Sequence, residues 1–157
     1  MYKRVLLASD GSRESLTALR EGALIARALK AEAFLLIVEK ETPGTRLADG
    51  VYVRPGDAGG RELLDLGLTR LERLGVAARG AVVAGEPAPE IAACARRFRA
   101  DLVVVGHRRQ SMLERWWSGA SGAYLSEKLD CSLLIARNVI SDQEFEAHLA
   151  TGATAGS

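Results

Sequence analysis

Five short apolar runs alternate with segments of helical spacing along this chain, and this alternation restricts the fold more than any other feature. Apolar runs without polar alternation are typical of strands that are covered on both faces, as in a parallel sheet. Strands that alternate with helices indicate an α/β fold of three layers, with a doubly wound, five-stranded parallel sheet between two layers of helices. The predicted strands are Lys3–Ala8, Ala33–Val38, Val76–Val83, Leu102–Val105 and Ser132–Ala136.

The segments between these strands carry the apolar spacing of helices. Ser12 is a predicted N-cap for a helix that continues to about Leu29. The segment Glu39–Gly60 is rich in proline and glycine and predicts a long mobile loop. Three further helices are predicted: one with Leu64, Leu68 and Leu71 that ends near Gly75, one after the Gly85–Pro89 turn with Ile91, Cys94, Ala95 and Phe98 on its apolar face, and one over Gly119–Leu129.

A chain of 157 residues has the length of one domain. We expect this domain to cover residues 1–138, followed by a C-terminal tail, residues 139–157, that is partly disordered or forms a short helix. The tail carries one short amphipathic turn around Phe145 and Leu149. Its last residues, Thr151–Ser157, are expected to fray.

Charge and cysteine content argue against several classes of protein. The 21 basic and 20 acidic residues nearly balance, which leaves no electrostatic footprint for nucleic acid or for an anionic membrane. No apolar run approaches the length that spans a bilayer, and Met1–Arg4 leads into a strand without a secretory signal, so we expect a cytoplasmic protein. Cys94 and Cys131 form neither a C-x-x-C pair nor part of a histidine cluster, so no disulfide framework and no structural zinc site are expected.

Two of the predicted strands end in a corner that contains glycine. Ala8-Ser9-Asp10-Gly11-Ser12 follows the first strand, and Gly106 follows the fourth, before a helix that opens near Gly119. Such corners present backbone N–H groups to a phosphate. If the strand order is 3-2-1-4-5, the carboxyl ends of strands one and four lie where the winding direction reverses, which is where ligands bind in such sheets. The two corners are therefore predicted to form one site.

Four segments together resemble the universal stress protein family. They are SDGS after the first strand, the turn GEPAPEI, the run DLVVVG, and the glycine before the helix that leads into SLLIAR. The resemblance covers residues 2 to 137 and implies a five-stranded 3-2-1-4-5 sheet, an adenine nucleotide alpha-hydrolase-like fold. It also implies a homodimer that forms through the edge strand Ser132–Ala136.

One subgroup of that family binds ATP through the signature G-x2-G-x9-G-[ST]. This chain keeps the first and third glycines as Gly106 and Gly119, but it has Arg109 at the second position and Ala120 at the hydroxyl position. Arginine cannot supply the close backbone approach or the positive φ of glycine at low cost. Its guanidinium can instead clamp phosphate oxygens, and Ser121 beside Ala120 can supply a hydroxyl.

The resemblance implies a ligand, ATP or another adenine nucleotide, with or without Mg²⁺. Asp10 is implied to meet the ribose or the adenine edge, Val38 to flank the base, and Gly106 and Gly119 to receive the phosphates. The implied binding residues are Ala8, Ser9, Asp10, Gly11, Val38, Gly106, Arg109, Gly119, Ala120 and Ser121.

Each of these residues also has a structural explanation. Gly11 and Gly106 are equally typical of tight turns after strands, and Asp10 of a residue that caps the first helix together with Ser12. A short charged run such as His107-Arg108-Arg109 is usually a solvated corner. Trp116 and Trp117 are more typical of packing anchors than of a base-stacking platform.

Sharper enzymatic chemistry is not indicated. The P-loop and dinucleotide signatures are absent, Gly119–Gly122 is not a nucleophile elbow, and neither histidine is placed as a general base. Ser9–Ser12 resembles the pyrophosphate loop of ATP-cleaving synthetases without its glycine pair, so an ATP-pyrophosphatase-type adenylating enzyme is the weakest alternative. We do not expect an enzyme, and slow ATP hydrolysis is the most that this sequence allows.

Two hypotheses from different classes remain. In the first, the protein is a dimeric stress-response sensor, and its Glu39–Gly60 loop or its tail changes order when ATP binds. In the second, the site is degenerate and the protein is a nucleotide-independent stress or scaffold dimer. The first predicts binding that depends on Gly106 and Gly119, and the second predicts an intact dimer without a ligand.

Overall fold

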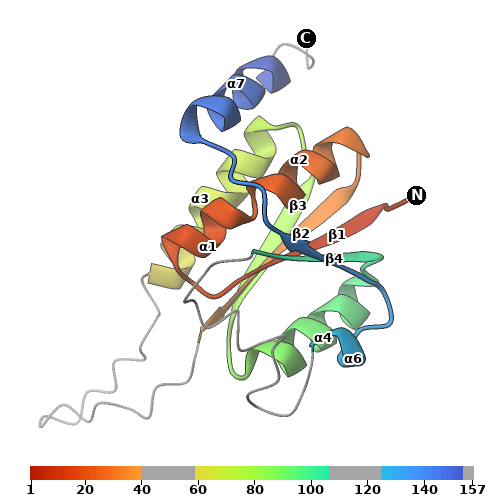
Figure 1. The fold of residues 1–157 in the computed structure, drawn as a ribbon. Helices are drawn as coiled ribbons and strands as arrows, with labels where there is room; N and C mark the ends of the chain where they lie inside the picture. Colours follow the sequence, from red (N-terminus) through yellow and green to blue (C-terminus); the bar gives the residue numbers. More distant parts are fainter. Residues whose placement is uncertain (40–58, 107–124, 154–157) are drawn as a thin grey trace, which may run out of the picture.

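The computed structural model describes residues 1–39, 59–106 and 125–153. A parallel sheet with the order β3-β2-β1-β4-β5 lies between two layers of helices, as predicted (Figure 1). Its strands are β1 (Arg4–Ser9), β2 (Glu32–Glu39), β3 (Ala78–Ala84), β4 (Leu102–Gly106) and β5 (Ser132–Ala136). The helices are α1 (Arg13–Ala18), α2 (Arg20–Ala28), α3 (Gly59–Arg73), α4 (Pro87–Phe98), α6 (Leu125–Lys128) and α7 (Asp142–Ala153).

Apolar side chains fill both faces of the central strands. Val5 and Leu7 of β1 belong to the cluster beneath α1, α2, α3 and α7, whereas Leu6 and Ala8 belong to the cluster beneath α4 and α6 (Figure 1). Successive residues of a strand point to opposite faces, so a strand that is covered twice must be apolar throughout. All five residues of β4 are buried for the same reason.

The predicted helix from Ser12 to about Leu29 is interrupted. Ser12 is the N-cap, and its Oγ accepts the Ser15 N–H at 3.0 Å. At Leu19 the backbone N–H is shared between the carbonyls of Ser15 (3.2 Å) and Leu16 (3.3 Å), and this residue separates α1 from α2. A shared bond of this kind tightens the local turn, so the segment is two short helices.

Glycines mark both ends of α3. The predicted loop extended to Gly60, but α3 already begins at Gly59, and a side chain at Gly60 would collide with the Glu39 carboxylate. At the other end Gly75 has a φ of 75°, and its N–H donates to the Glu72 carbonyl at 2.8 Å. This left-handed conformation ends the helix where the sequence predicts. Residues 40–58 of the predicted loop lie outside the described residues.

The C-terminal segment, for which a short helix was one expectation, has more helix than the single turn that the sequence indicated. Instead of one short turn around Phe145 and Leu149, it forms the twelve-residue helix α7. Both side chains are buried, because they pack into the cluster formed by α1, α2, α3 and the sheet. Thr151, which was expected to fray, lies within this helix. The division of the chain near residue 138 into a domain and a tail stays a prediction.

In the parts of the chain that the structure describes, no helix has the length and apolar character needed to cross a bilayer. Of the helix predicted over Gly119–Leu129, the described part is α6.

The contact between β2 and β3 depends on Gly80. A Cβ at this position would lie 2.4 Å from the Leu35 carbonyl oxygen and 2.6 Å from Leu64 Cδ1. We predict that Gly80→Ala lowers the free energy of unfolding by about 1–3 kcal/mol, because the two strands must separate. Gly59→Ala is the control, since nothing lies within 4 Å of a Cβ there. Urea unfolding measures both variants, and equal stability would contradict the packing described here.

Candidate functional site

The carboxyl ends of β1 and β4 lie side by side, on the two central strands of the sheet. Ala8 pairs with Val105, so Ser9 and Gly106 are the next residues along their strands. From this point the chain enters α1 above the sheet (Figure 1). The structure thus brings the two predicted corners together, although they are about a hundred residues apart in the sequence.

Hydrogen bonds hold the first corner in one conformation. The Oδ1 atom of Asp10 accepts the N–H of Ser12 at 3.0 Å and its hydroxyl at 2.6 Å. Ser9 Oγ accepts the Gly11 N–H at 3.2 Å, and Ser15 Oγ accepts the Asp10 N–H at 3.3 Å. Asp10 and Ser12 therefore do support the start of α1, which is the structural explanation that their sequence allowed. Ser15, which is 1% exposed, is a part of this corner that sequence reasoning missed.

The same bonds leave part of the corner available to a ligand. Asp10 is half-buried, and its Oδ2 atom makes no hydrogen bond with any residue that the structure describes. Ser9 and Ala8 are fully buried, so their side chains do not reach the surface. Gly11 has a φ of 80°, which side chains rarely tolerate, so the turn after β1 requires glycine. Asp10 is thus a side chain of this corner that can offer an acceptor to a ligand.

Gly106 has a packing role that the sequence did not reveal. It lies within β4, and a Cβ there would approach the Ala18 Cβ to 2.4 Å. The absence of a side chain lets the end of β4 pack directly against α1. This packing role is a structural explanation other than the tight turn that its sequence allowed, and its place beside the first corner is as expected. Its predicted role in binding phosphate stays a prediction.

Val38 lies near the end of β2, on the other side of β1. Ser9 pairs with Ile37, so Val38 and Asp10 follow next on neighbouring strands. The Val38 side chain is buried in the cluster beneath α4. The structure therefore gathers Ala8, Ser9, Asp10, Gly11, Val38 and Gly106 at one edge of the sheet. Outside the described residues lie Arg109, Gly119, Ala120 and Ser121, together with His107, Arg108, Trp116 and Trp117.

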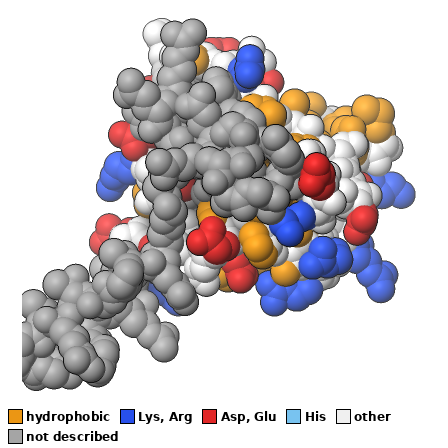
Figure 2. Space-filling model, turned by 60° about the horizontal axis from the view of Figure 1, so that its bottom comes forward, with side chains coloured by type: hydrophobic (Ala, Val, Ile, Leu, Met, Phe, Trp, Pro, Cys, Tyr) orange, Lys and Arg blue, Asp and Glu red, His pale blue; other side chains and the backbone are white. Residues whose placement is uncertain are grey.

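A hollow of about 170 Å³ lies between α4 and α6, on the opposite face of the sheet from α1. Arg96, Arg99 and Lys128 line it together with Asp130, and basic side chains gather on this side of the molecule (Figure 2). Arg96 lies in the last turn of α4, where a positive charge stabilises the helix carbonyls. This basic surface therefore has a structural explanation of its own.

Among the described residues, the cysteines and His148 lie away from the carboxyl ends of β1 and β4. Burial raises the pKa of the Cys94 and Cys131 thiols, and Asp101 and Asp130 raise that of Cys131 further. Both thiols therefore stay protonated at neutral pH and are poor nucleophiles. His148 lies in α7, and among the described residues no group of three His, Cys, Asp or Glu could hold a metal ion.

Comparison with known proteins identifies the family of this chain. The model of the universal stress protein family matches residues 1–137. This chain belongs to the universal stress protein family. The universal stress protein YxiE of Bacillus subtilis is 33% identical over 148 residues, which cover 87% of this chain and 100% of YxiE. The universal stress protein MJ0531 of Methanocaldococcus jannaschii is 28% identical over 141 residues, which cover 87% of this chain and 83% of that protein.

A solved structure of a family member was obtained in complex with cAMP. Its TM-score to this chain is 0.64 at 25% sequence identity, and the superposition covers 87% of this chain and 97% of that one. The fold is thus that of a family in which at least one member was solved with an adenine nucleotide.

The contact between Gly106 and α1 yields a test by double substitution. We predict that Gly106→Ala lowers the free energy of unfolding by about 1–3 kcal/mol, because its Cβ needs the space that the Ala18 Cβ occupies. Ala18→Gly frees that space, so the double variant should lose less than the sum of the two single changes. Chemical denaturation of the four proteins measures the coupling, and strictly additive losses would refute the close approach.

Proposed function

We propose that this protein binds an adenine nucleotide at the carboxyl ends of β1 and β4 and acts as a nucleotide-dependent regulator in a stress response. The observation that carries the proposal is the meeting of the Asp10 corner and Gly106 at the point where the winding of the sheet reverses. Family membership supports it, and so does the relative that was solved with cAMP.

In this proposal the residues of the corner have distinct roles. Asp10 keeps its Oδ1 on Ser12 and uses its Oδ2 to accept a hydrogen bond from a ribose hydroxyl or from the adenine amino group. Because Oδ1 is already held, the carboxylate is oriented before the ligand arrives, which lowers the entropic cost of binding. The fixed turn at Gly11 holds the corner in this shape, and Gly106 contributes by letting the end of β4 pack against α1 beside it.

The phosphate end of the nucleotide is assigned to the glycine-containing signature. We propose that Arg109, Gly119 and Ser121 contact the phosphates, with the Arg109 guanidinium in place of the missing second glycine. ATP is the proposed nucleotide. If Mg²⁺ takes part, we propose that it enters bound to the phosphates.

We also propose a homodimer that forms through β5. This strand lies at the edge of the sheet, where it pairs with β4, and Leu133, Leu134 and Ile135 are only half-buried. An apolar edge strand exposes unpaired backbone groups that a second copy can satisfy. The same observation supports the second candidate function, a stress or scaffold dimer that needs no nucleotide.

Calorimetric titration with ATP, ADP, AMP and cAMP separates the two candidates. We predict that Asp10→Asn weakens nucleotide binding roughly tenfold or more, because the bond to a charged acceptor is lost while Oδ1 can still support Ser12. Glu72→Gln, the same loss of charge at the carboxyl end of α3, should leave the affinity unchanged.

A second variant tests the signature. The double substitution Arg109→Gly with Ala120→Ser restores the ATP-binding signature and should tighten ATP binding. If neither the natural chain nor the restored chain binds any of the four nucleotides, the sensor function is rejected and the scaffold dimer remains.

A further inference from the structure

The helix α7 lies beyond the part of the chain that the family shares. The family match ends at residue 137, and α7 begins at Asp142. The helix packs on the outer side of α2 and α3, away from the strand ends (Figure 1). It therefore adds to this chain a contact that is not part of the family fold.

This contact is a helix in an apolar groove. Phe145 and Leu149 are 3% and 1% exposed, whereas most of the other residues of α7 with a described side chain are exposed. The two positions are four residues apart, so they form a single stripe on one side of the helix. The groove that receives them is lined by Leu16 and Leu19 of the α1–α2 segment, Ala23 of α2, Leu71 of α3 and Leu35 of the sheet.

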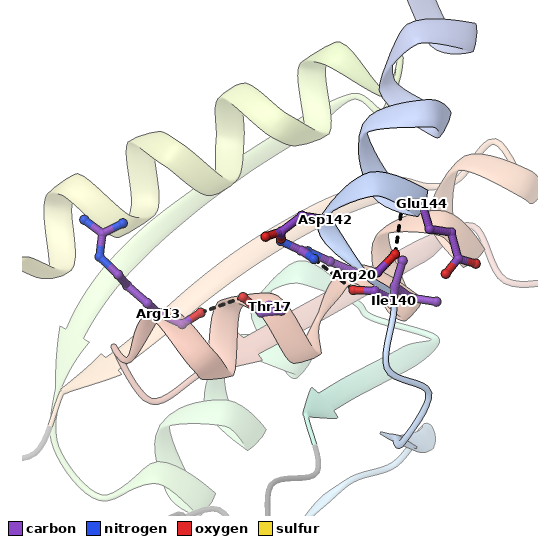
Figure 3. Close-up of polar contacts among 7 residues, drawn as sticks. Arg13, Thr17, Arg20, Ile140, Asp142 and Glu144 are labelled. Atoms are coloured by element: carbon purple, nitrogen blue, oxygen red, sulfur yellow. Dashed lines mark hydrogen bonds and ion pairs between the residues drawn. The ribbon is translucent and has the colours of Figure 1, made fainter.

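Arginines surround this groove and bind α7 at several points. Arg20 is 6% exposed, forms an ion pair with Asp142 at the first position of α7, and donates from Nη1 to the Ile140 carbonyl at 2.8 Å (Figure 3). Its guanidinium also lies 5.2 Å from the centre of the Phe145 ring. Arg27 and Arg73 hold the rest of the helix by donating to the His148 carbonyl at 2.9 Å and to the Glu146 carboxylate at 3.3 Å.

The helix α7 does not fill the whole groove, and it leaves one buried donor there without a partner among the described residues. A cavity of about 30 Å³ remains beside Phe145, lined by Arg20 and Arg70 as well as by the apolar floor. The Nε–H of Arg20 is buried there and has no hydrogen-bond partner among the described residues. Burial and, to a lesser extent, the nearby charge of Arg20 lower the pKa of Arg70, and the acidic Glu146 and Asp142 of α7 offset part of this effect. A helix that placed an acceptor at Arg20 Nε would fit better than α7 does.

We propose that this groove between α2 and α3 is a helix-binding site which α7 occupies in cis, and which binds an amphipathic helix of a partner protein when α7 leaves. The partner helix has two apolar residues four positions apart and acidic residues in its first turn, the chemistry that Arg20 and the apolar floor recognise. Amphipathic helices in apolar grooves are a recurrent form of protein recognition. This site is separate from the strand ends, so the proposal does not depend on nucleotide binding.

The connection to α7 is suited to such a displacement. Glu21 Oε2 accepts the N–H groups of Arg137 and Asn138, both at 3.1 Å, and Glu21 Oε1 accepts the Asn138 side-chain amide at 2.6 Å. These bonds keep the end of β5 attached to α2 whether or not α7 is docked. The helix α7 can leave once its polar contacts are broken and its two apolar side chains are withdrawn from the groove.

A fluorescein-labelled peptide of residues 139–153 tests the proposal in trans. Phe145→Asp in the full chain undocks α7 by placing a charge in the apolar groove, so this variant should bind the peptide at micromolar concentration. The natural chain should bind it at least tenfold more weakly, because α7 competes. Glu144→Gln, a change at an exposed position of the first turn, should bind as weakly as the natural chain. Arg20→Gln added to Phe145→Asp should abolish binding.

Hydrogen exchange of the natural chain provides a test that needs no variant. The amides of α7 should exchange by local opening, at least tenfold faster than those of β1 and β4. Equal exchange of α7 and β1 would mean that α7 opens only when the whole protein unfolds, and this would overturn the proposal. It would also be overturned if a folded Phe145→Asp variant bound no peptide. If the protection of the α7 amides from exchange rises with protein concentration, the groove binds a second copy of this chain. That result would overturn the proposal of a partner protein as the occupant.

Discussion

The parallel pairing of β1 with β4 is the constraint on which the rest of this structure depends. It joins Val5–Ala8 to Leu102–Val105, segments that are distant in the sequence, in a continuous register. The Asp101 carboxylate accepts the N–H groups of Lys3 at 2.8 Å and Arg4 at 3.0 Å, which fixes the amino ends of the two strands. At the carboxyl ends no equivalent side chain closes the sheet among the described residues, and there the chain leaves β1 for α1.

The geometry of the candidate site follows from this pairing together with the position of α1. Gly106 allows the end of β4 to approach Ala18, and the bonds among Ser9, Asp10 and Ser12 hold the first turn of the helix. The corner is therefore formed before any ligand binds, and Asp10 Oδ2, which has no hydrogen bond to a described residue, is its available acceptor. Preorganisation of this kind is what allows a small number of polar groups to give useful affinity.

The strands could be predicted because they depend on local patterns, whereas their order, and with it the convergence of the two corners, came from the family resemblance. Continuous apolar runs identify buried strands, and the resemblance supplied the order of the sheet. The residues missed by sequence reasoning act through contacts across the fold. Nothing near Gly106 in the sequence indicates that Ala18 will pack against it, so only a phosphate contact or a tight turn was considered for this glycine. Ser15 was missed for the same reason, because it contributes to the corner through Asp10.

The helix α7 was underestimated because its stability comes from tertiary contacts. Its own sequence offers only Phe145 and Leu149 as an apolar stripe, and isolated helices of this length are marginal in water. The groups that hold it include Arg20 and Arg27, which precede it by more than a hundred residues. No local pattern in the tail could reveal these partners. The fold brings Arg20 against Asp142 (Figure 3) and Arg73 against Glu146.

The most direct test of the central claim is a titration of ¹⁵N-labelled protein with AMP or ATP, followed by NMR. If the nucleotide binds at the strand ends, the amides of Asp10, Gly11, Ser12 and Gly106 should shift together and saturate with one dissociation constant. The amides of Arg96 and Arg99, beside the basic hollow on the opposite face, should stay unchanged. Shifts confined to that hollow, or no shifts at all at millimolar nucleotide, would contradict a site at the meeting of β1 and β4.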